Sequence, residues 1–484
     1  MANSPYWIRF AIVVLLISPF LLIVGFVDHW RWPLWSEAGP VFYFTCLQAF
    51  LSAAGALLFG SLGGLGLLFL ADRTWRRVFE LFLILPSLVP TLFVLVSLMG
   101  VAQEVGLKLF GLWGIVVVHW VINVGLVAVA VSRMVDYKLG GMLELAWIEG
   151  ATRLDLWRAG LWGYLRRDLA LLFLFLFSVS FTSFAVPLIL GGVKGTTMEV
   201  LIYNKMGMSG ALGEALVLST WQTVVLLAFG FLLSRQTQSL KSRKLRTDLI
   251  HWPWGILFPL SAVLVVVMGQ LVASGDIGIL LHSGFKNLWP DVAGTLAVGF
   301  LAGAFVFILL ALVVYCLPHS RFQSFLVGYA APSAAVTGFG LWLISGDDVG
   351  TSLLLIALGV AIVSLPVMYR YNVDSAFTPL LGQVRAARTL GGSWSMIFWK
   401  ITRPQVSAAI GLAAGFTAFW ATGDFALSSI IAPEELTVAL RAKSLLASYR
   451  IEESAQLVWV ILILGGALWG LFVTLGRVFS GVKG

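Results

Sequence analysis

The sequence has little charge and almost no cysteine. Only 11% of its 484 residues are charged, whereas 60% are hydrophobic. Soluble domains carry roughly 25% charged and roughly 45–50% apolar residues, so a soluble globular domain is excluded. The two cysteines, Cys46 and Cys316, lie in apolar runs near opposite sides of the expected membrane, so we expect no disulfide between them.

Several chemical signatures are also missing. The sequence has no Gly-Lys dipeptide, which a phosphate-cradling nucleotide loop requires. The five histidines show no metal-ligand spacing, and no basic stretch is interleaved with the stacking aromatics typical of nucleic-acid-binding proteins. We therefore expect no catalytic residue, metal site, cofactor or nucleic-acid partner in this chain. A membrane-embedded enzyme is a less supported alternative, because no nucleophile–base spacing occurs.

Long apolar runs dominate the sequence instead. Most are near 20 residues, the length at which an α-helix crosses about 30 Å of hydrocarbon with its backbone satisfied internally. Twelve runs begin near residues 7, 41, 78, 113, 169, 214, 254, 291, 325, 351, 406 and 456. The pattern predicts an all-α membrane protein with about twelve transmembrane helices. The first run lacks a small-x-small cleavage site, so we expect it to be retained.

The distribution of Lys and Arg predicts the orientation. With the N-terminus inside, the inner segments hold 23 of the 31 Lys and Arg residues, and positive residues gather in cytoplasmic loops. We therefore expect a multi-pass protein with both termini cytoplasmic. The net charge of +8 suits a face lying against the anionic lipids of a bilayer.

Two features recur at an offset of about half the chain. A polar segment that begins at Glu144 returns 241 residues later at Arg385, and Pro86-Ser87 returns 246 residues later as Pro332-Ser333. Six helices per repeat would give two parallel repeats, related by a pseudo-twofold axis along the membrane normal. We expect a first transmembrane domain over 1–234, a cytoplasmic linker over 235–253 and a second transmembrane domain over 254–484.

Pairs of small residues within helices indicate close packing. Gly60 and Gly64, and Gly411 and Gly415, have the four-residue spacing that lets membrane helices approach one another. We assign them to helix packing.

Polar residues inside membrane helices are costly and often functional. Asp424 stands in the eleventh run, and its counterpart at the 241 offset is Ser183. The candidates for a translocation path are Pro86, Asn123, Ser180, Ser183, Pro332, Thr417, Thr422 and Asp424. The alternatives are irregular packing at the prolines, an Asp424 held by water or backbone groups, and an Asn123 that only bonds neighbouring helices.

The repeated polar segments resemble the signature of binding-protein-dependent ABC importer permeases: Glu-Ala-Ala, three residues, Gly, nine residues, then Ile-x-Leu-Pro. The first polar segment, residues 144–163, keeps Glu144, Ala146 and Gly150 but has Gly160 and Trp162-Gly163 at the later positions. The second polar segment, residues 385–404, keeps Ala386, Ala387, Gly391, Ile401 and Pro404. It has Arg385 in place of Glu.

The resemblance implies that both segments dock on a cytoplasmic ATPase. Small residues at the alanine positions would allow close helix approach, and the glycines would permit a sharp turn between two short helices. The implied coupling residues are Glu144, Ala146, Gly150, Ala151, Thr152, Asp155, Arg158, Arg385, Ala386, Ala387, Gly391, Ser393 and Pro404. Glu144 in the first segment corresponds to Arg385 in the second. Because these residues have opposite charges, we expect the two docking sites to differ.

Two permease domains in one chain are similar to the ferric-iron and thiamine branch of these importers. The resemblance implies a bacterial inner-membrane permease that works by alternating access, with a periplasmic binding protein and two ATPase subunits that supply ATP and magnesium. The alternative is a secondary transporter of the major facilitator type. It rests on residues 70–77, whose Asp-Arg and Arg-Arg pairs match that family's loop while both glycines are missing.

Overall fold

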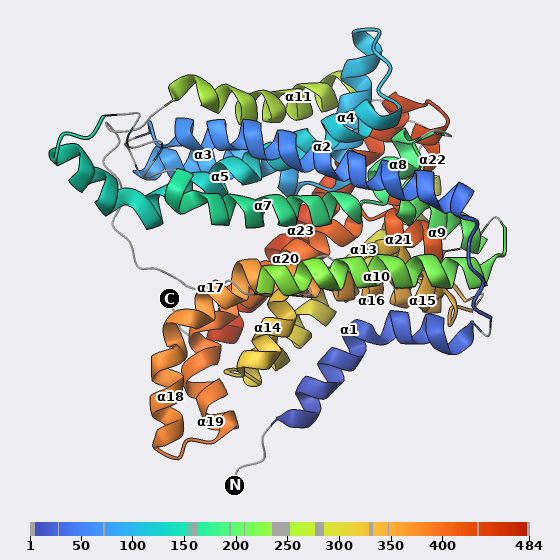
Figure 1. The fold of residues 1–484 in the computed structure, drawn as a ribbon. Coiled ribbons are helices and arrows are strands. Elements are labelled where there is room, and N and C mark those ends of the chain that lie inside the picture. The colour runs from blue at the N-terminus through green and yellow to red at the C-terminus, as the bar shows by residue number, and fades with distance from the viewer. Residues whose placement is uncertain are drawn as a thin grey trace.

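The computed structural model describes residues 5–27, 29–70, 73–152, 155, 158, 162–192, 195–207, 209–234, 252–275, 285–328, 333–346, 348–432 and 435–481. These residues form helices and connecting turns, and no strand occurs among them (Figure 1). Pro332 and nearly all of the expected linker over 235–253 lie outside the described residues.

The first half of the chain begins with a helix that runs without interruption through the first expected span. Its helices are α1 (Tyr6–Phe26), α2 (Trp35–Leu67), α3 (Arg73–Leu88), α4 (Thr91–Glu104), α5 (Gly111–Ile148), α7 (Gly163–Phe181), α8 (Ala185–Leu190), α9 (Met198–Gly207) and α10 (Leu212–Ser234).

The second half has a similar order of long and short helices. Its membrane-domain helices are η2 (Pro253–Ile256), α11 (Leu257–Ser274), α13 (Phe285–Tyr315), α14 (Ser320–Gly328), α15 (Ala334–Trp342), α16 (Val349–Met368), α20 (Arg403–Thr422), α21 (Ala426–Ile431), α22 (Val438–Ala447) and α23 (Ile451–Ser480). Between α16 and α20 lie η3 (Tyr369–Val373), α17 (Asp374–Phe377), η4 (Thr378–Leu380), α18 (Leu381–Thr389), α19 (Trp394–Ile397) and η5 (Phe398–Thr402).

Eight helices among the described residues are long and apolar enough to cross a membrane. They cover Tyr6–Phe26, Trp35–Leu67, Gly111–Asp136, Leu212–Phe229, Pro253–Ser274, Leu288–Tyr315, Val349–Thr389 and Ile451–Ser480. The bent pair of α3 and α4 makes a ninth if it is one span. By length and composition the chain is an all-α, multi-pass membrane protein.

The other expected spans are helical but do not meet the same criteria. α7 occupies the fifth run and carries Arg166, Arg167 and Asp168 near its start. α20 occupies the eleventh run, and the ninth run is divided between the nine-residue helices α14 and α15. The structure therefore supports helices at these runs but not a count of twelve spans.

The third run bends at a different proline from the one expected. Pro86 lies inside α3, whereas the chain turns by 89° between Leu88 and Thr91, beside Pro90. Proline has no N–H to continue a helix, and it disfavours the α conformation at the preceding Val89. Pro86 lies inside α3 without ending it.

The two halves interlock rather than standing apart. The first helix of each half packs on a helix of the other half: α1 on α15, and α11 on α4. A Cβ at Gly340 of α15 would lie 2.1 Å from the Pro19 carbonyl oxygen of α1, so this crossing needs a glycine. One core cluster combines α4 and α8 with α11, α22 and α23.

The glycine pairs noted in the sequence lie at close helix contacts, as predicted. A Cβ at Gly60 would lie 2.5 Å from the Val127 side chain, which brings α2 against α5. A Cβ at Gly411 would lie 2.6 Å from the Gly476 Cα, which brings α20 against α23. Both pairs of helices are among the most extensive contacts of the fold.

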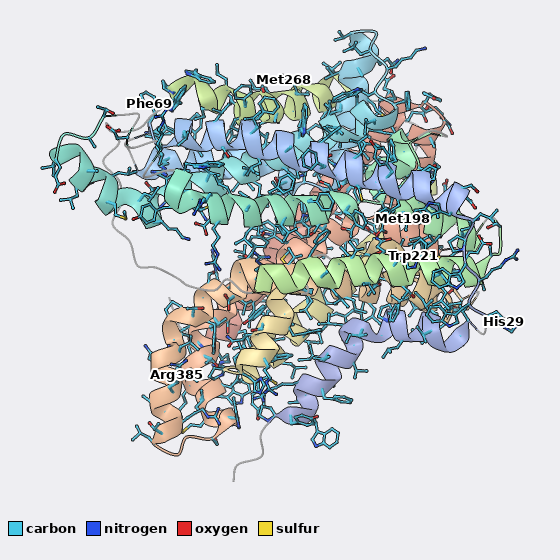
Figure 2. The ribbon with its side chains drawn as sticks, viewed as in Figure 1. His29, Phe69, Met198, Trp221, Met268 and Arg385 are labelled. Atoms are coloured by element: carbon cyan, nitrogen blue, oxygen red, sulfur yellow. The ribbon has the colours of Figure 1, made fainter. Side chains whose placement is uncertain are left out.

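The bundle has two distinct ends. In Figure 1 the C-terminal end of α5 and the α18–α19 pair project at the same end of the molecule, on the left. α9 and α22 lie toward the right. Figure 2 places Phe69 and Arg385 at the left and His29 at the right. The two polar segments therefore share one end of the bundle.

Candidate docking segments and central cavity

The first polar segment begins inside α5, which continues beyond its apolar part to Ile148. Gly150 then adopts a φ of +85°, a left-handed conformation that costs a residue with a Cβ about 1–2 kcal/mol. The Ala151 N–H donates to the Ala146 carbonyl at 3.0 Å and closes the helix end. The turn expected at Gly150 is present.

The second polar segment has the same geometry 241 residues later. Gly391 follows α18 with a φ of +82°. The Gly392 N–H donates to the Ala387 carbonyl at 2.9 Å, the counterpart of the bond at Ala146. Both helices therefore end in the same glycine-terminated turn.

A hydroxyl residue starts the next helical turn in each segment. The Ser393 Oγ accepts from the Met396 N–H at 3.2 Å and caps α19. In the first segment, the Asp155 N–H donates to the Thr152 Oγ1 at 3.3 Å, and the Asp155 Oδ2 accepts from the Thr152 N–H at 3.0 Å. This reciprocal arrangement is a capping box with Asp at its second position.

The hydrogen bonds of this capping box perturb an exposed carboxyl group. The Thr152 hydroxyl and then the Thr152 N–H stabilise the charged form of Asp155, so they lower its pKa below the usual value. Arg158, also exposed, acts in the same direction. The carboxylate holds its charge at neutral pH while it orders the turn.

Large apolar side chains are exposed at both tips. Ile148, just before Gly150, is 79% exposed, and Leu390, just before Gly391, is 87% exposed. The charged residues Glu149 and Arg385 of the same segments are also exposed. Figure 2 shows Arg385 on α18, in the part that projects from the bundle. Exposed apolar residues ringed by charge are typical of a protein-binding surface.

The second polar segment is attached to the first helix of the chain. The Arg388 guanidinium lies 4.1 Å from the centre of the buried Trp394 ring, and the Arg9 guanidinium of α1 lies 5.3 Å from it. Arg9 is buried and donates from Nη2 to the Cys316 carbonyl at 3.0 Å. Trp394 thus holds two cations by cation–π contact.

Ion pairs join α5, the helix that leads into the first polar segment, to neighbouring helices of its own half. The Lys138 Nζ lies 2.6 Å from the Asp168 Oδ2 and joins α5 to α7. The Arg76 Nη2 lies 2.7 Å from the Asp136 Oδ2 and joins α3 to α5. The two polar segments therefore share a backbone geometry. Cation–π contacts hold the second one, whereas ion pairs hold the helix that leads into the first.

The remaining coupling candidates have separate environments. Glu144 and Ala146 are half-buried on α5, Ala386 is exposed, and Ala387 packs against the core of the second half. Pro404 lies in the first turn of α20, where a proline needs no hydrogen-bond partner for its nitrogen.

A cavity of about 320 Å³ lies between the two halves. Its wall comes from the bend between α3 and α4, from α5 and α8, and from α15, α16, α20 and α21. Of the predicted path residues, Pro86 and Asp424 line it. The sequence thus predicted two wall residues that are far apart in the chain.

The other path candidates lie in neighbouring hydrogen bonds. The Asn123 Nδ2 donates to the His119 carbonyl at 2.9 Å within α5, and Ser183 Oγ lies 3.0 Å from His119 Nε2. Thr417 donates from Oγ1 to the Ala413 carbonyl, and its Oγ1 lies 3.3 Å from the oxygen of Ser364, which lines the cavity.

Two path candidates, Ser180 and Thr422, take part in hydrogen bonds outside the cavity wall. The Ser180 carbonyl accepts from Gln48 Nε2 at 2.8 Å, and the Thr422 hydroxyl donates to the Phe419 carbonyl at 2.7 Å. Neither residue contributes to the cavity wall.

Sequence reasoning missed Trp420 as a member of this wall. Its indole Nε1 donates to the Leu88 carbonyl at 2.8 Å, which joins α20 to the bend of the other half. α20 ends at Thr422, and Asp424 lies in the break before α21, so the four-residue spacing between Trp420 and Asp424 does not place them on one helix face. No local pattern in the sequence pointed to Trp420.

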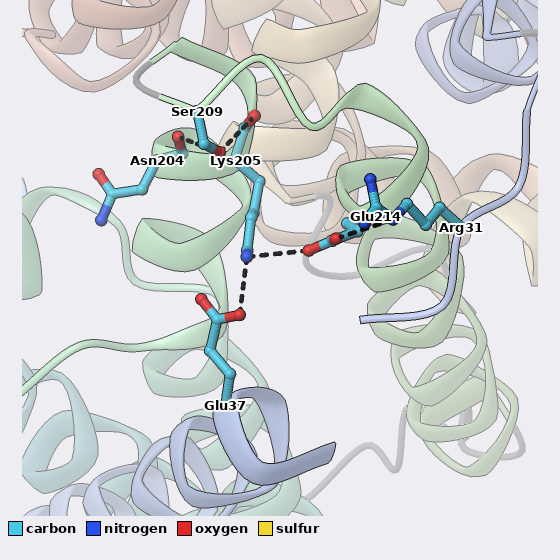
Figure 3. A network of polar contacts seen from close by, with 6 residues as sticks. All are labelled: Arg31, Glu37, Asn204, Lys205, Ser209 and Glu214. Atoms are coloured by element: carbon cyan, nitrogen blue, oxygen red, sulfur yellow. Dashed lines mark hydrogen bonds and ion pairs between the residues drawn. The ribbon is translucent and has the colours of Figure 1, made fainter. Parts of the chain in front are cut away.

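The opposite end of the bundle is closed by a charge network (Figure 3). Lys205 Nζ lies 2.7 Å from Glu37 Oε2 and 2.8 Å from Glu214 Oε2, and Arg31 extends the network to the other Glu214 oxygen at 3.5 Å. It joins the start of α2, the end of α9 and the start of α10.

No cluster of three His, Cys, Asp or Glu residues that could hold a metal ion occurs in the part of the chain that the structure describes. No known family model, curated protein or solved structure matches this chain.

Proposed function

We propose that this chain is the membrane-spanning permease of an ATP-driven ABC importer, with both permease domains in one polypeptide. The observation that carries the proposal is the pair of polar segments at one end of the bundle. Each has a helix, a glycine with φ above +80°, a hydroxyl cap and an exposed apolar tip. Such surfaces suit docking on two copies of a cytoplasmic ATPase.

A matched buried hydrogen bond supports the proposed internal repeat. The Thr45 Oγ1 of α2 accepts from the Met198 N–H at the start of α9, and the Thr295 Oγ1 of α13 accepts from the Val438 N–H at the start of α22. Both bonds are 2.9 Å long. We infer two parallel six-helix repeats, with twelve spans and a pseudo-twofold axis along the membrane normal.

The cavity supports alternating access between these repeats. A solute delivered by a periplasmic binding protein would enter from the end that carries α9 and α22. It would then pass through the cavity, whose wall is formed by both halves. ATP and magnesium would act in the partner ATPase. A ferric-iron or thiamine-like cargo and a bacterial inner-membrane location are proposed on the sequence resemblance.

Co-purification tests the proposed partner. The chain, expressed with candidate cytoplasmic ABC ATPases, should form a complex with two ATPase copies whose hydrolysis responds to a loaded binding protein. The double variant Ile148→Asp/Leu390→Asp should lose that complex, because it places charge on both apolar tips. Ser209→Asp, at an exposed position beside Lys205 at the opposite end, is the control.

Two results would overturn the proposal. One is a complex that survives the double variant unchanged. The other is transport by the chain alone, driven by an ion gradient without an ATPase, which would favour the major facilitator alternative. Gly150→Pro and Gly391→Pro test the expected inequality of the docking sites: the two variants should reduce transport to different extents.

A further inference from the structure

The central cavity is electrostatically one-sided. Of the described side chains that line it, Asp424 alone is ionisable. The other polar side chains there include the neutral hydroxyls of Ser87, Thr91 and Ser364. Ser183, which matches Asp424 at the 241 offset, is neutral and lies against His119 outside the wall. The cavity therefore has a carboxylate on the α20–α21 side without a charged counterpart on the other side.

Asp424 has no cationic partner within the described chain. No described Lys, Arg or His nitrogen lies within the 4.0 Å ion-pair limit of its carboxylate. Its Oδ2 accepts from the N–H groups of Leu427 at 3.1 Å and Ser428 at 3.4 Å. These bonds orient the carboxylate, but they do not neutralise it. A half-buried charge of this kind favours a positive ligand.

An aromatic residue, Trp420, lines the same cavity as Asp424, and the bond from its indole N–H to the Leu88 carbonyl holds the ring in place. A carboxylate with an indole ring is the pairing that proteins use for organic ammonium ions, because the ring face attracts a weakly hydrated cation. The rest of the wall is largely apolar, including Val360, Val363 and Val367.

The same features disfavour other ligand classes. Of the cargoes proposed above, ferric iron fits this wall poorly, because a bare multivalent metal ion takes several oxygen, nitrogen or sulfur ligands and this wall offers one carboxylate and neutral hydroxyls. An anion would be repelled by Asp424. The volume of about 320 Å³ corresponds to roughly ten water molecules at about 30 Å³ each, enough for a small organic molecule.

We propose that Asp424 and Trp420 form a transit subsite for a small organic cation inside the cavity between the two halves. This assignment rests on the proposed transport function and names the charge class of its solute. The carboxylate pairs with the positive nitrogen of the ligand, Trp420 contacts its alkyl or aromatic groups, and the valine wall covers its apolar part.

Equilibrium binding to the purified full-length chain tests the subsite. The chain is placed in phosphatidylcholine nanodiscs without an ATPase, and radiolabelled benzyltrimethylammonium is the probe. Choline should displace the probe, whereas 3,3-dimethylbutan-1-ol, which has the shape of choline without its charge, should not. Asp424→Asn should weaken binding by about tenfold or more, the loss expected for a charge-assisted contact.

Three further variants make the result specific. Asp424→Glu keeps the charge and should retain most of the affinity, and Trp420→Phe should weaken binding less than Asp424→Asn. Asp348→Asn removes an exposed carboxylate outside the cavity and should bind like the unmodified chain. Thermal unfolding of each variant checks that it is folded.

The results that would overturn the subsite differ from those that would overturn the proposed transport function. Absence of saturable binding, equal binding to a folded Asp424→Asn variant, or equal displacement by the neutral alcohol overturns the subsite. Failure to form an ATPase complex overturns the importer role but leaves cation binding by the chain intact. Binding of the probe with an unchanged ATPase complex supports both.

Discussion

At the scale of single residues, matched positions of the two polar segments adopt the same backbone conformation although their neighbouring side chains differ. Gly150 and Gly391 both have positive φ, and Thr152 and Ser393 both begin the next turn. Glycine is the residue that takes this conformation without a steric cost. The match therefore follows from backbone geometry, which the surrounding side chains do not change.

Asp155 gives the first polar segment a pH dependence. Its folded-state pKa lies below the ordinary value of 3.8, so the unfolded turn binds protons more readily. The stabilisation is complete above 3.8 and is lost as the pH falls through the lower folded pKa. A spin label on Glu149→Cys should become mobile in that acid range, as measured by electron paramagnetic resonance.

The variant Asp155→Asn gives the neutral-pH counterpart of this experiment. It removes the charged acceptor of the Thr152 bonds, so the same label should already be mobile at neutral pH. Asp348→Asn removes a similar cap from the start of α16 and should leave this label unchanged. A label equally immobile in Asp155→Asn would show that the carboxylate does not order the turn.

Trp394 provides a second test at this scale. Trp394→Ala removes the buried ring between Arg9 and Arg388 and should lower stability by roughly 3–5 kcal/mol, the usual cost of truncating a buried aromatic side chain. Thermal unfolding in detergent micelles measures the change. Trp394→Phe keeps a ring and should cost less, and equal losses would contradict the cation–π contribution.

At the scale of elements, the crossing of first helices determines how the halves fit together. α1 packs on α15 and α11 packs on α4, so the first helix of each half lies against the other half. The core clusters cross the expected boundary between 1–234 and 254–484 for the same reason. That the two transmembrane domains are repeats is a proposal. That they pack against each other is observed in the structure.

The threonine bonds at α9 and α22 test the repeat directly. Thr45→Val and Thr295→Val keep the side-chain shape but leave the Met198 and Val438 N–H groups without their acceptor. An unsatisfied buried donor costs about 1–3 kcal/mol. Both variants should lower the unfolding temperature by similar amounts. A loss in only one of them would show that the two bonds are not equivalent.

At the scale of the whole molecule, the two ends of the bundle carry different polar features. The polar segments project at one end, and the Lys205 network closes the other. Positive residues gather on the cytoplasmic side of membrane proteins. The end with the polar segments is therefore the proposed cytoplasmic face.

Cysteine labelling tests this orientation. In a Cys46→Ser/Cys316→Ser background, Thr389→Cys lies on the polar-segment end and Ser209→Cys on the opposite end, both exposed. A membrane-impermeant maleimide should label Ser209→Cys in intact spheroplasts and Thr389→Cys only in inverted vesicles. The opposite labelling pattern would reverse the proposed topology.

The sequence predicted the features that depend on local chemistry. The helix positions followed from apolar length, and the glycine turns followed from the spacing around Gly150 and Gly391. It misplaced the bend, because Pro86 and Pro90 carry the same local restriction and packing selects between them. It also missed Trp420, whose role depends on Leu88 from the other half.

The sequence by itself determined an all-α membrane protein, because a chain so apolar must satisfy its backbone within helices. It also determined where the two polar segments turn. Only the tertiary structure decided that the halves interlock through α1 and α11, and that Asp424 and Trp420 face a cavity with Pro86. Those contacts join residues far apart in the chain, as in the bond between Trp420 and Leu88, which are 332 positions apart, and no local pattern encodes them.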